Sequence, residues 1–271
     1  MPGSPRLRAY LAFAVAGFRR HSTYRQATVA ACVTNSVFGF LRAAVMLAVL
    51  AAGGSVIAGY DAPRLMTFVW AGQGLIGTVL IWAPPELAGR IRTGDVVIDL
   101  LRPVDLVGQQ LASDLGRAGF AMGVRFAVPV AIGALLFDLH APARLLTYPL
   151  FACSLVLATL VCFSCRFLVN AAAYWLLDAR GPQMAWTLTS GILGGLYFPL
   201  WFLPPAVALA VVAGLPFAST IQLPLDVLVE RGGVATQLAL LGVQAGWAVV
   251  MLALCRWVQA RGERKLVVQG G

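Results

Sequence analysis

Six runs of mainly apolar residues, each long enough or nearly long enough to cross a lipid bilayer, dominate this sequence. A membrane-spanning helix needs about 20 such residues. The runs cover residues 27–58, 65–83, 114–137, 146–177, 184–202 and 236–257. Charged residues make up only 11% of the chain, whereas an ordinary soluble domain has about 25%. The sequence therefore excludes a water-soluble enzyme and predicts an all-α membrane protein with six transmembrane helices.

The basic residues predict the orientation of these spans. The net charge is +9, which in a soluble protein would suggest a nucleic-acid partner. In a membrane protein, arginine and lysine collect in cytoplasmic segments. With both termini in the cytoplasm, the inner segments hold thirteen basic residues and the outer loops hold three. We therefore expect a multi-pass protein of the cytoplasmic membrane that has inner termini and no nucleic-acid partner.

The chain is expected to form one transmembrane domain. Residues 203–235 precede the last run and are apolar, but several prolines interrupt them, and proline breaks a helical hydrogen-bond ladder. We interpret this stretch as an outer hairpin of short re-entrant or interfacial helices. The domain divides into an inner amphipathic helix (1–26), spans 1–2 (27–83), an inner hairpin (84–105), spans 3–5 (106–202), the outer hairpin (203–235), and span 6 with a cytoplasmic tail (236–271).

The first segment has the pattern of an amphipathic helix that lies in the membrane plane. Leu7, Leu11, Val15 and Phe18 follow a helical stripe, and arginines lie off the stripe or at its ends. The segment is either a simple membrane anchor or an elbow helix that also contacts a cytoplasmic partner.

The inner hairpin combines apolar residues with charges of both signs. Gly94 is expected to divide it into two short helices, and Asp105 can cap the helix that follows. Leu87, Ile91, Ile98 and Leu101 are expected to share one helical face, and Glu86 and Arg90 have the spacing of an i, i+4 ion pair. An apolar stripe with mixed charges fits a docking helix for a soluble partner, although such a helix can also pack beneath its own bundle. The residues proposed for this coupling role are Glu86, Leu87, Arg90, Ile91, Arg92, Asp95, Ile98, Asp99 and Arg102.

Several charged and polar residues fall within the apolar runs or at their edges. A charge in the bilayer costs about 2.5–3.5 kcal/mol on insertion scales, so such residues usually pair or line a polar path. Asp114 and Arg117 have the spacing of a local ion pair, but carboxylates are too few to neutralise all the arginines. Backbone carbonyls, lipid phosphates or an anionic or amphiphilic substrate could serve instead. The candidate pore or structural positions are Arg42, Gln73, Asp114, Arg117, Arg125, Arg166 and Asn170.

The sequence lacks the motifs of an ATPase and of other enzymes. The single lysine, Lys265, is in the tail, so no phosphate-binding loop ends in Lys-Ser/Thr. His21 and His140 are expected on opposite sides of the membrane, and no catalytic or metal-ligand motif is present. We therefore predict no catalytic residues, no metal and no cofactor in this chain.

The inner hairpin and the fourth run resemble a known family. The stretches ELAGRIRTGD (86–95), DLLRPVD (99–105) and RFLVNAAAYWLLDARG (166–181) are similar to bacterial ABC transporter permeases of the type-2 exporter class. More narrowly, they are similar to the "ABC-2 family transporter protein" branch, related to daunorubicin- and viologen-type exporter permeases. This resemblance implies an elbow helix, a coupling helix between spans 2 and 3, and short outer helices before span 6.

The resemblance also implies partners. A permease of this branch pairs with a second, related or identical permease and with a separate ABC ATPase dimer, which holds ATP and Mg²⁺. The expected function is export of a drug-like, lipid-like or other amphipathic molecule across the bacterial cytoplasmic membrane, with membrane lipids around the chain. The alternatives are a secondary transporter driven by an ion gradient, or a membrane-embedded enzyme that modifies lipids.

Overall fold

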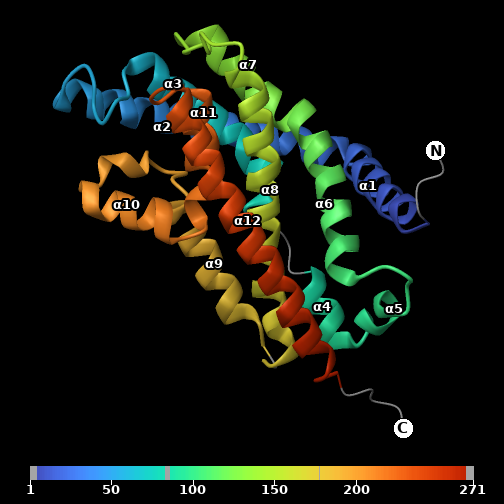
Figure 1. The fold of residues 1–271 in the computed structure, drawn as a ribbon. Coiled ribbons are helices and arrows are strands. Elements are labelled where there is room, and N and C mark those ends of the chain that lie inside the picture. Colours follow the sequence, from blue (N-terminus) through green and yellow to red (C-terminus); the bar gives the residue numbers. More distant parts are fainter. Residues whose placement is uncertain (1–4, 83–85, 177, 267–271) are drawn as a thin grey trace.

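The computed structural model describes residues 5–82, 86–176 and 178–266, and every regular element in these ranges is a helix. Figure 1 shows the helices packed in a bundle, with α8 and α12 side by side at its centre. The ends predicted for spans 2 and 4, at residues 83 and 177, and the start of the hairpin at residue 84 lie outside the described residues.

Four of the described helices are long and apolar enough to cross a membrane. They match predicted spans 1, 3, 4 and 6. In chain order they are α2 (Arg25–Gly53), the continuous helix of α6 (Leu106–Ala121), η2 (Met122–Phe126) and α7 (Ala127–Leu136), α8 (Thr147–Ala171) with η3 (Ala172–Tyr174), and α12 (Val234–Glu263).

Predicted spans 2 and 5 correspond to shorter helices. The second consists of α3 (Ala62–Leu75), which continues into the π-helix η1 (Ile76–Leu80). The fifth contains α9 (Arg180–Leu193), whose 14 residues cover about 21 Å of a hydrocarbon core that is about 30 Å thick. Six spans therefore remain a prediction, whereas the all-helical membrane fold is confirmed.

The prediction of a continuous helix to residue 202 is wrong, because α9 ends at Leu193. Gly195 has φ +78°, which glycine adopts without steric cost. The backbone N–H of Leu196 donates to the carbonyl of Gly191 at 2.9 Å, as in a Schellman C-cap. A Cβ atom on Gly195 would lie 2.5 Å from Oε1 of Gln222. The chain therefore turns at Gly195 instead of extending the helix.

α8 forms the centre of the bundle. It contacts α4, α6, α9, α11 and α12, and it is the most buried of the four long helices. Polar contacts fix its register with α12, since the Ser154 hydroxyl donates to Oε1 of Gln244 at 2.6 Å. Two apolar clusters surround α8. One contains Trp70 of α3, and the other, nearer the hairpin, contains Phe163 of α8 itself.

The amphipathic helix α1 (Pro5–Thr23) packs closely against α6. A Cβ atom on Gly116 would lie 1.8 Å from the carbonyl oxygen of Ala14, and one on Gly17 would lie 2.1 Å from that of Ser113. The two glycines therefore bring the helix backbones into direct contact. The apolar stripe of α1 stays largely exposed, as at Leu11. A helix at residues 5–23 is confirmed, and its position in the membrane plane remains a prediction.

Short helices precede α12, as predicted. They are η4 (Leu200–Phe202), α10 (Pro205–Gly214), η5 (Phe217–Ser219) and α11 (Gln222–Leu228). The buried Asp226 of α11 accepts hydrogen bonds from Tyr60, from Trp201 at 2.7 Å and from Gln222 at 2.9 Å. This network holds the segment against the loop that joins α2 to α3.

Candidate functional site

The predicted hairpin forms two short helices, α4 (Glu86–Thr93) and α5 (Val96–Leu100), as the sequence indicates. Gly94 lies between them with φ +81°, a conformation that favours glycine. Asp105 caps α6, because its carboxylate accepts a hydrogen bond from the N–H of Gly108 at 2.7 Å. We call residues 86–105 the α4–α5 hairpin.

The apolar residues of the hairpin do not share one face, which corrects the sequence prediction. Leu87 and Ile91 of α4 are 5% and 7% exposed and pack beneath the bundle. Ile98 and Leu101 are 59% and 81% exposed. The turn at Gly94 breaks the helical register, so only the α5 side presents apolar surface.

Ion pairs hold the hairpin together in an arrangement that sequence spacing did not predict. Glu86 pairs with Arg20 of α1 at 2.9 Å, and the predicted pair with Arg90 is not present. Arg90 instead contacts Asp99 of α5 at 2.7 Å, and Arg102 lies 3.6 Å from the same carboxylate. The side chain of Asp99 is 4% exposed. This buried carboxylate therefore fastens α5 to α4.

The remaining predicted coupling residues, Arg92 and Asp95, lie at the outer surface of the hairpin. Asp95 accepts a hydrogen bond from the Thr93 hydroxyl at 2.7 Å. Arg92 lines a cavity of about 350 Å³ together with Asp178 and Arg180, which lie just before or at the start of α9. The backbone carbonyl of Asp95 also accepts a hydrogen bond from Arg90 at 3.3 Å, next to the ion pair of Arg90 with Asp99.

A second ion-pair group lies on α6 and α8. Asp114 contacts Arg117 of its own helix at 2.8 Å and Arg166 of α8 at 2.7 Å. The predicted local pair is therefore confirmed, and Arg166 makes an interhelical pair. Arg117 also donates to the carbonyls of Gly77 and Thr78, both at 2.9 Å, which lie in η1, where the helical ladder of span 2 ends.

Arg125 and Arg42 make no ion pair within the described residues. Arg125 lies in η2, and its Nε atom is buried and has no hydrogen-bond partner there. The same holds for Nε and Nη1 of Arg42 on α2. Gln73 is 1% exposed, and its backbone carbonyl accepts a hydrogen bond from the Asn35 side chain at 3.1 Å. Of Arg125, Arg42 and Gln73, only Arg125 lines the cavity described next.

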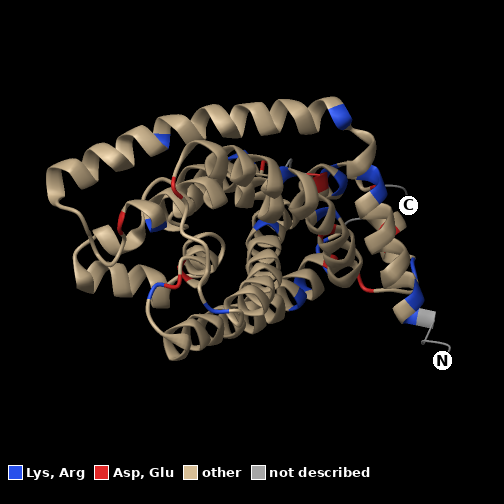
Figure 2. Cartoon of the chain, turned by 90° about the horizontal axis from the view of Figure 1, so that it is seen from above, with Lys and Arg blue, Asp and Glu red and all other residues tan. Residues whose placement is uncertain are grey.

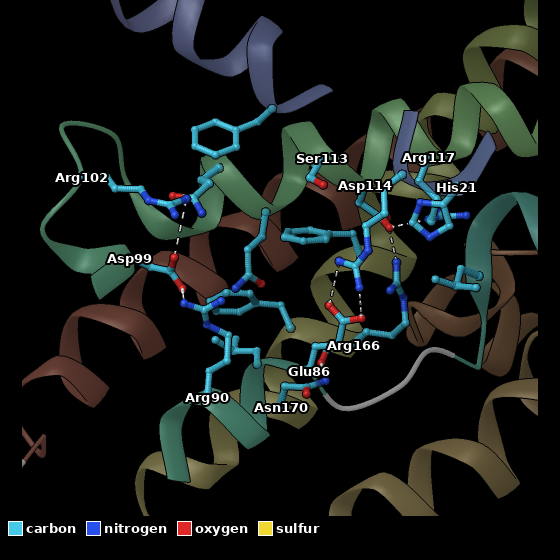
Figure 3. Close-up of a pocket in the computed structure, with 18 of the residues that line it drawn as sticks. His21, Glu86, Arg90, Asp99, Arg102, Ser113, Asp114, Arg117, Arg166 and Asn170 are labelled. Atoms are coloured by element: carbon cyan, nitrogen blue, oxygen red, sulfur yellow. Dashed lines mark hydrogen bonds and ion pairs between the residues drawn. The ribbon is translucent and has the colours of Figure 1, made fainter. Parts of the chain in front are cut away.

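A cavity of about 530 Å³ lies between α1, α6, α8 and the α4–α5 hairpin. We call it the arginine cavity. Figure 3 shows Asp114, Arg117 and His21 along one side of it and Arg90, Asp99 and Arg102 along the opposite side. The predicted site residues that line it are Glu86, Leu87, Arg90, Asp99, Arg102, Asp114, Arg117, Arg125, Arg166 and Asn170. Ile91, Arg92, Asp95, Ile98, Arg42 and Gln73 do not line it.

The structure adds lining residues that sequence analysis did not select. Arg20 and His21 come from α1, and Gln109, Gln110 and Ser113 come from the first turns of α6. The signal for Gln109, Gln110 and Ser113 in the sequence is their position directly before the third apolar run, which begins at residue 114. The close contact of α1 with α6 brings the two groups together, and this contact is not visible in spacing alone.

Basic residues gather toward the side of the molecule that holds both described chain ends (Figure 2). In the described part of the chain, no group of three or more His, Cys, Asp or Glu side chains is placed to hold a metal ion.

Comparison with known protein families gives one match. The family model described as "ABC-2 family transporter protein" matches residues 40–270, which include the α4–α5 hairpin and three of the four long helices. Neither the curated proteins nor the solved structures gave a match. The matched range covers most of the chain and agrees with the membrane fold, and the protein therefore belongs to the ABC-2 family of transporter proteins.

Proposed function

We propose that this chain is the permease subunit of an exporter driven by a separate ATPase dimer that binds the α4–α5 hairpin. Family membership makes the chain an ABC transporter permease and implies association with an ABC ATPase. The direction of transport, the dimeric state of the ATPase and the amphipathic nature of the cargo belong to the proposal.

The observation that carries the proposal is the exposed apolar surface of the hairpin. Ile98 and Leu101 are exposed beside Asp99, whose carboxylate holds Arg90 and Arg102 in place. A soluble partner can bury the two apolar side chains, while the charges around them set its register. The α4 side of the hairpin cannot serve in this way, because Leu87 and Ile91 already pack against the chain itself.

The hairpin is also connected to the bundle in a way that can transmit movement. Oδ1 of Asn170 on α8 accepts a hydrogen bond from the N–H of Ala88 on α4 at 3.1 Å. Glu86 joins α4 to α1, and α5 leads through Asp105 into α6. A force applied at Leu101 would therefore reach α1, α6 and α8, which surround the arginine cavity.

The membrane topology and the other subunits of the transporter are also part of the proposal. Six spans place both termini in the cytoplasm of a bacterium, on the same side as the hairpin and the ATPase. A second permease, identical or related, completes the translocation path, and ATP with Mg²⁺ binds in the ATPase subunits. This chain supplies no catalytic residue.

Leu101→Asp tests the docking surface. A buried carboxylate opposite an apolar groove is costly, so we expect the variant to lose its ABC ATPase partner during copurification in mild detergent. Leu145→Asp is the matched control, because Leu145 is 86% exposed and lies in the loop before α8. Retention of the ATPase by Leu101→Asp, or its equal loss from both variants, would contradict the proposal. Transport that needs no ATPase would favour the ion-driven alternative.

A further inference from the structure

We propose that the arginine cavity binds the anionic headgroup of an amphiphile and that Arg125 is the principal cation that contacts it. The inference rests on the proposed function, since it names the class of molecule that the permease recognises. The chemistry recognised is an oxyanion, such as a phosphate or a carboxylate, that is attached to an apolar chain.

The lining of the cavity carries more positive than negative charge. Six arginines and three carboxylates contribute to it, which leaves an excess of three positive charges. The arginines are Arg20, Arg90, Arg102, Arg117, Arg125 and Arg166, and the carboxylates are Glu86, Asp99 and Asp114. His21 adds no charge at neutral pH, because burial and the neighbouring Arg117 and Arg20 lower the pKa of its imidazole below 6.5.

Each carboxylate is already engaged. Asp114 forms ion pairs with Arg117 and Arg166. Asp99 pairs with Arg90 and Arg102, and Glu86 pairs with Arg20. Arg125 makes no ion pair with any described residue. A partly buried charge without a counterion is unfavourable, and a bound anion would remove that penalty.

The position of Arg125 fits a role in binding an anionic headgroup. Its side chain packs over Gly77, where a Cβ atom would lie 3.0 Å from Cβ and Cδ of the arginine. Glycine at position 77 therefore leaves room for the stem of Arg125 to lie against span 2. The buried Nε atoms of Arg125, Arg166 and Arg90 all lack hydrogen-bond partners among the described residues. All three arginines line the cavity, and a guanidinium group binds an oxyanion through charge-assisted hydrogen bonds.

The apolar residues that line the rest of the cavity can contact the apolar chain of an amphiphile. Phe13 of α1 and Phe163 and Phe167 of α8 line the cavity with Leu80 and Leu87. A volume of about 530 Å³ lies within the range of small-molecule sites, about 300–1,000 Å³. It accommodates a headgroup and the first part of an acyl chain. An inorganic anion would leave the apolar part of the cavity unfilled.

Native mass spectrometry of the purified full chain in non-ionic detergent tests the inference. The probes are dimyristoylphosphatidylglycerol, dimyristoylphosphatidylcholine with the same chains and no net charge, and inorganic phosphate. We expect the phosphatidylglycerol to bind more tightly than the phosphatidylcholine. Arg125→Gln should weaken phosphatidylglycerol binding about tenfold, the scale of one charge-assisted hydrogen bond. Arg125→Lys should retain most of it.

Arg42→Gln is the matched control, because it removes a second buried, unpaired arginine that lies outside the cavity. It should leave lipid binding unchanged. Equal binding of the two lipids, or equal weakening by Arg125→Gln and Arg42→Gln, would overturn the inference. Displacement of the lipid by inorganic phosphate at equal concentration would also overturn it, because the ligand would then be a free anion.

Failure of this inference is distinguishable from failure of the proposed function. Arg125→Gln should still copurify with the ATPase, since Arg125 lies in η2 and is not part of the exposed surface formed by Ile98 and Leu101 on the hairpin. Loss of lipid discrimination with the ATPase retained counts against the headgroup site alone.

Discussion

Asn170 of α8 accepts a hydrogen bond from the backbone N–H of Ala88 at 3.1 Å and so caps the first turn of α4. This is a direct polar connection between a central membrane helix and the α4–α5 hairpin. An N-terminal cap contributes about 1 kcal/mol to a helix. The pair therefore stabilises α4 and couples it to α8.

Asn170→Ala should loosen this connection. We expect faster amide hydrogen exchange across residues 86–93 and less transport per ATP hydrolysed, because movement of the hairpin would reach α8 less directly. Asn170→Asp is the control, since it retains an oxygen acceptor for the N–H of Ala88. Unchanged exchange in Asn170→Ala would show that packing alone holds α4 in place.

Asp99 should matter more to the hairpin than Glu86. Asp99 is 4% exposed and forms ion pairs with two arginines, so its removal abolishes two partly buried pairs at once. Glu86 and Arg20 are both about 60% exposed, and such surface pairs contribute about 0–1 kcal/mol. Asp99→Ala should therefore lower the thermal unfolding midpoint clearly, and Glu86→Ala should change it little. A larger effect of Glu86→Ala would reverse this ranking.

The contact between α1 and α6 should depend on Gly116. Its added Cβ would lie 1.8 Å from the carbonyl oxygen of Ala14, so Gly116→Ala should separate the helices and lower the unfolding midpoint. Gly119 is the matched control on the same helix, since a Cβ there meets no atom within 4 Å. Gly119→Ala should be neutral or stabilising by up to about 1 kcal/mol, because alanine favours helix more than glycine does.

Stability should fall at acid pH through Glu230. Burial opposes its ionisation, but hydrogen bonds from the Thr147 hydroxyl and from the N–H groups of Arg144 and Ala143 lower its pKa from 4.5 to about 2. A lowered folded-state pKa stabilises the protein above pH 4.5, and the contribution is lost as pH falls toward 2.

The measurement is the unfolding midpoint between pH 7 and pH 2. Glu230→Gln should start lower at pH 7 and show a shallower decline, because its side chain does not titrate. Glu263→Gln, at the exposed end of α12, is the control and should follow the unmodified protein. Parallel curves for the unmodified protein and Glu230→Gln would assign the acid sensitivity to other groups.

The membrane fold and the order of its elements were predictable from the sequence because they depend on local properties. Apolar runs of spanning length, the caps at Asp105 and the turn at Gly94 act within a few residues of their own position. The pair between Asp114 and Arg117 is local in the same way, at a spacing of three residues. Family membership followed from the hairpin sequence and agrees with the family match.

Tertiary structure decided which side chains meet. Spacing suggested that Glu86 pairs with Arg90, but Arg20 lies against Glu86 because α1 packs on α6, and Asp99 takes Arg90 because Gly94 reverses the chain. Because of the same turn, Leu87 is buried against the bundle, whereas Leu101 is exposed. At the end of α9, Gln222, distant in sequence, lies against Gly195 and leaves no room for a Cβ atom there.

The sequence by itself thus determined that this chain is a helical membrane protein with an excess of arginine. It could not determine which arginine lacks a counterion, because Glu86 pairs with Arg20 and Asp114 pairs with Arg166, on helices that are far apart in the chain. Only the packing of α1, α6 and α8 around one cavity brings Arg166 to Asp114 as well and leaves Arg125 without a carboxylate among the described residues.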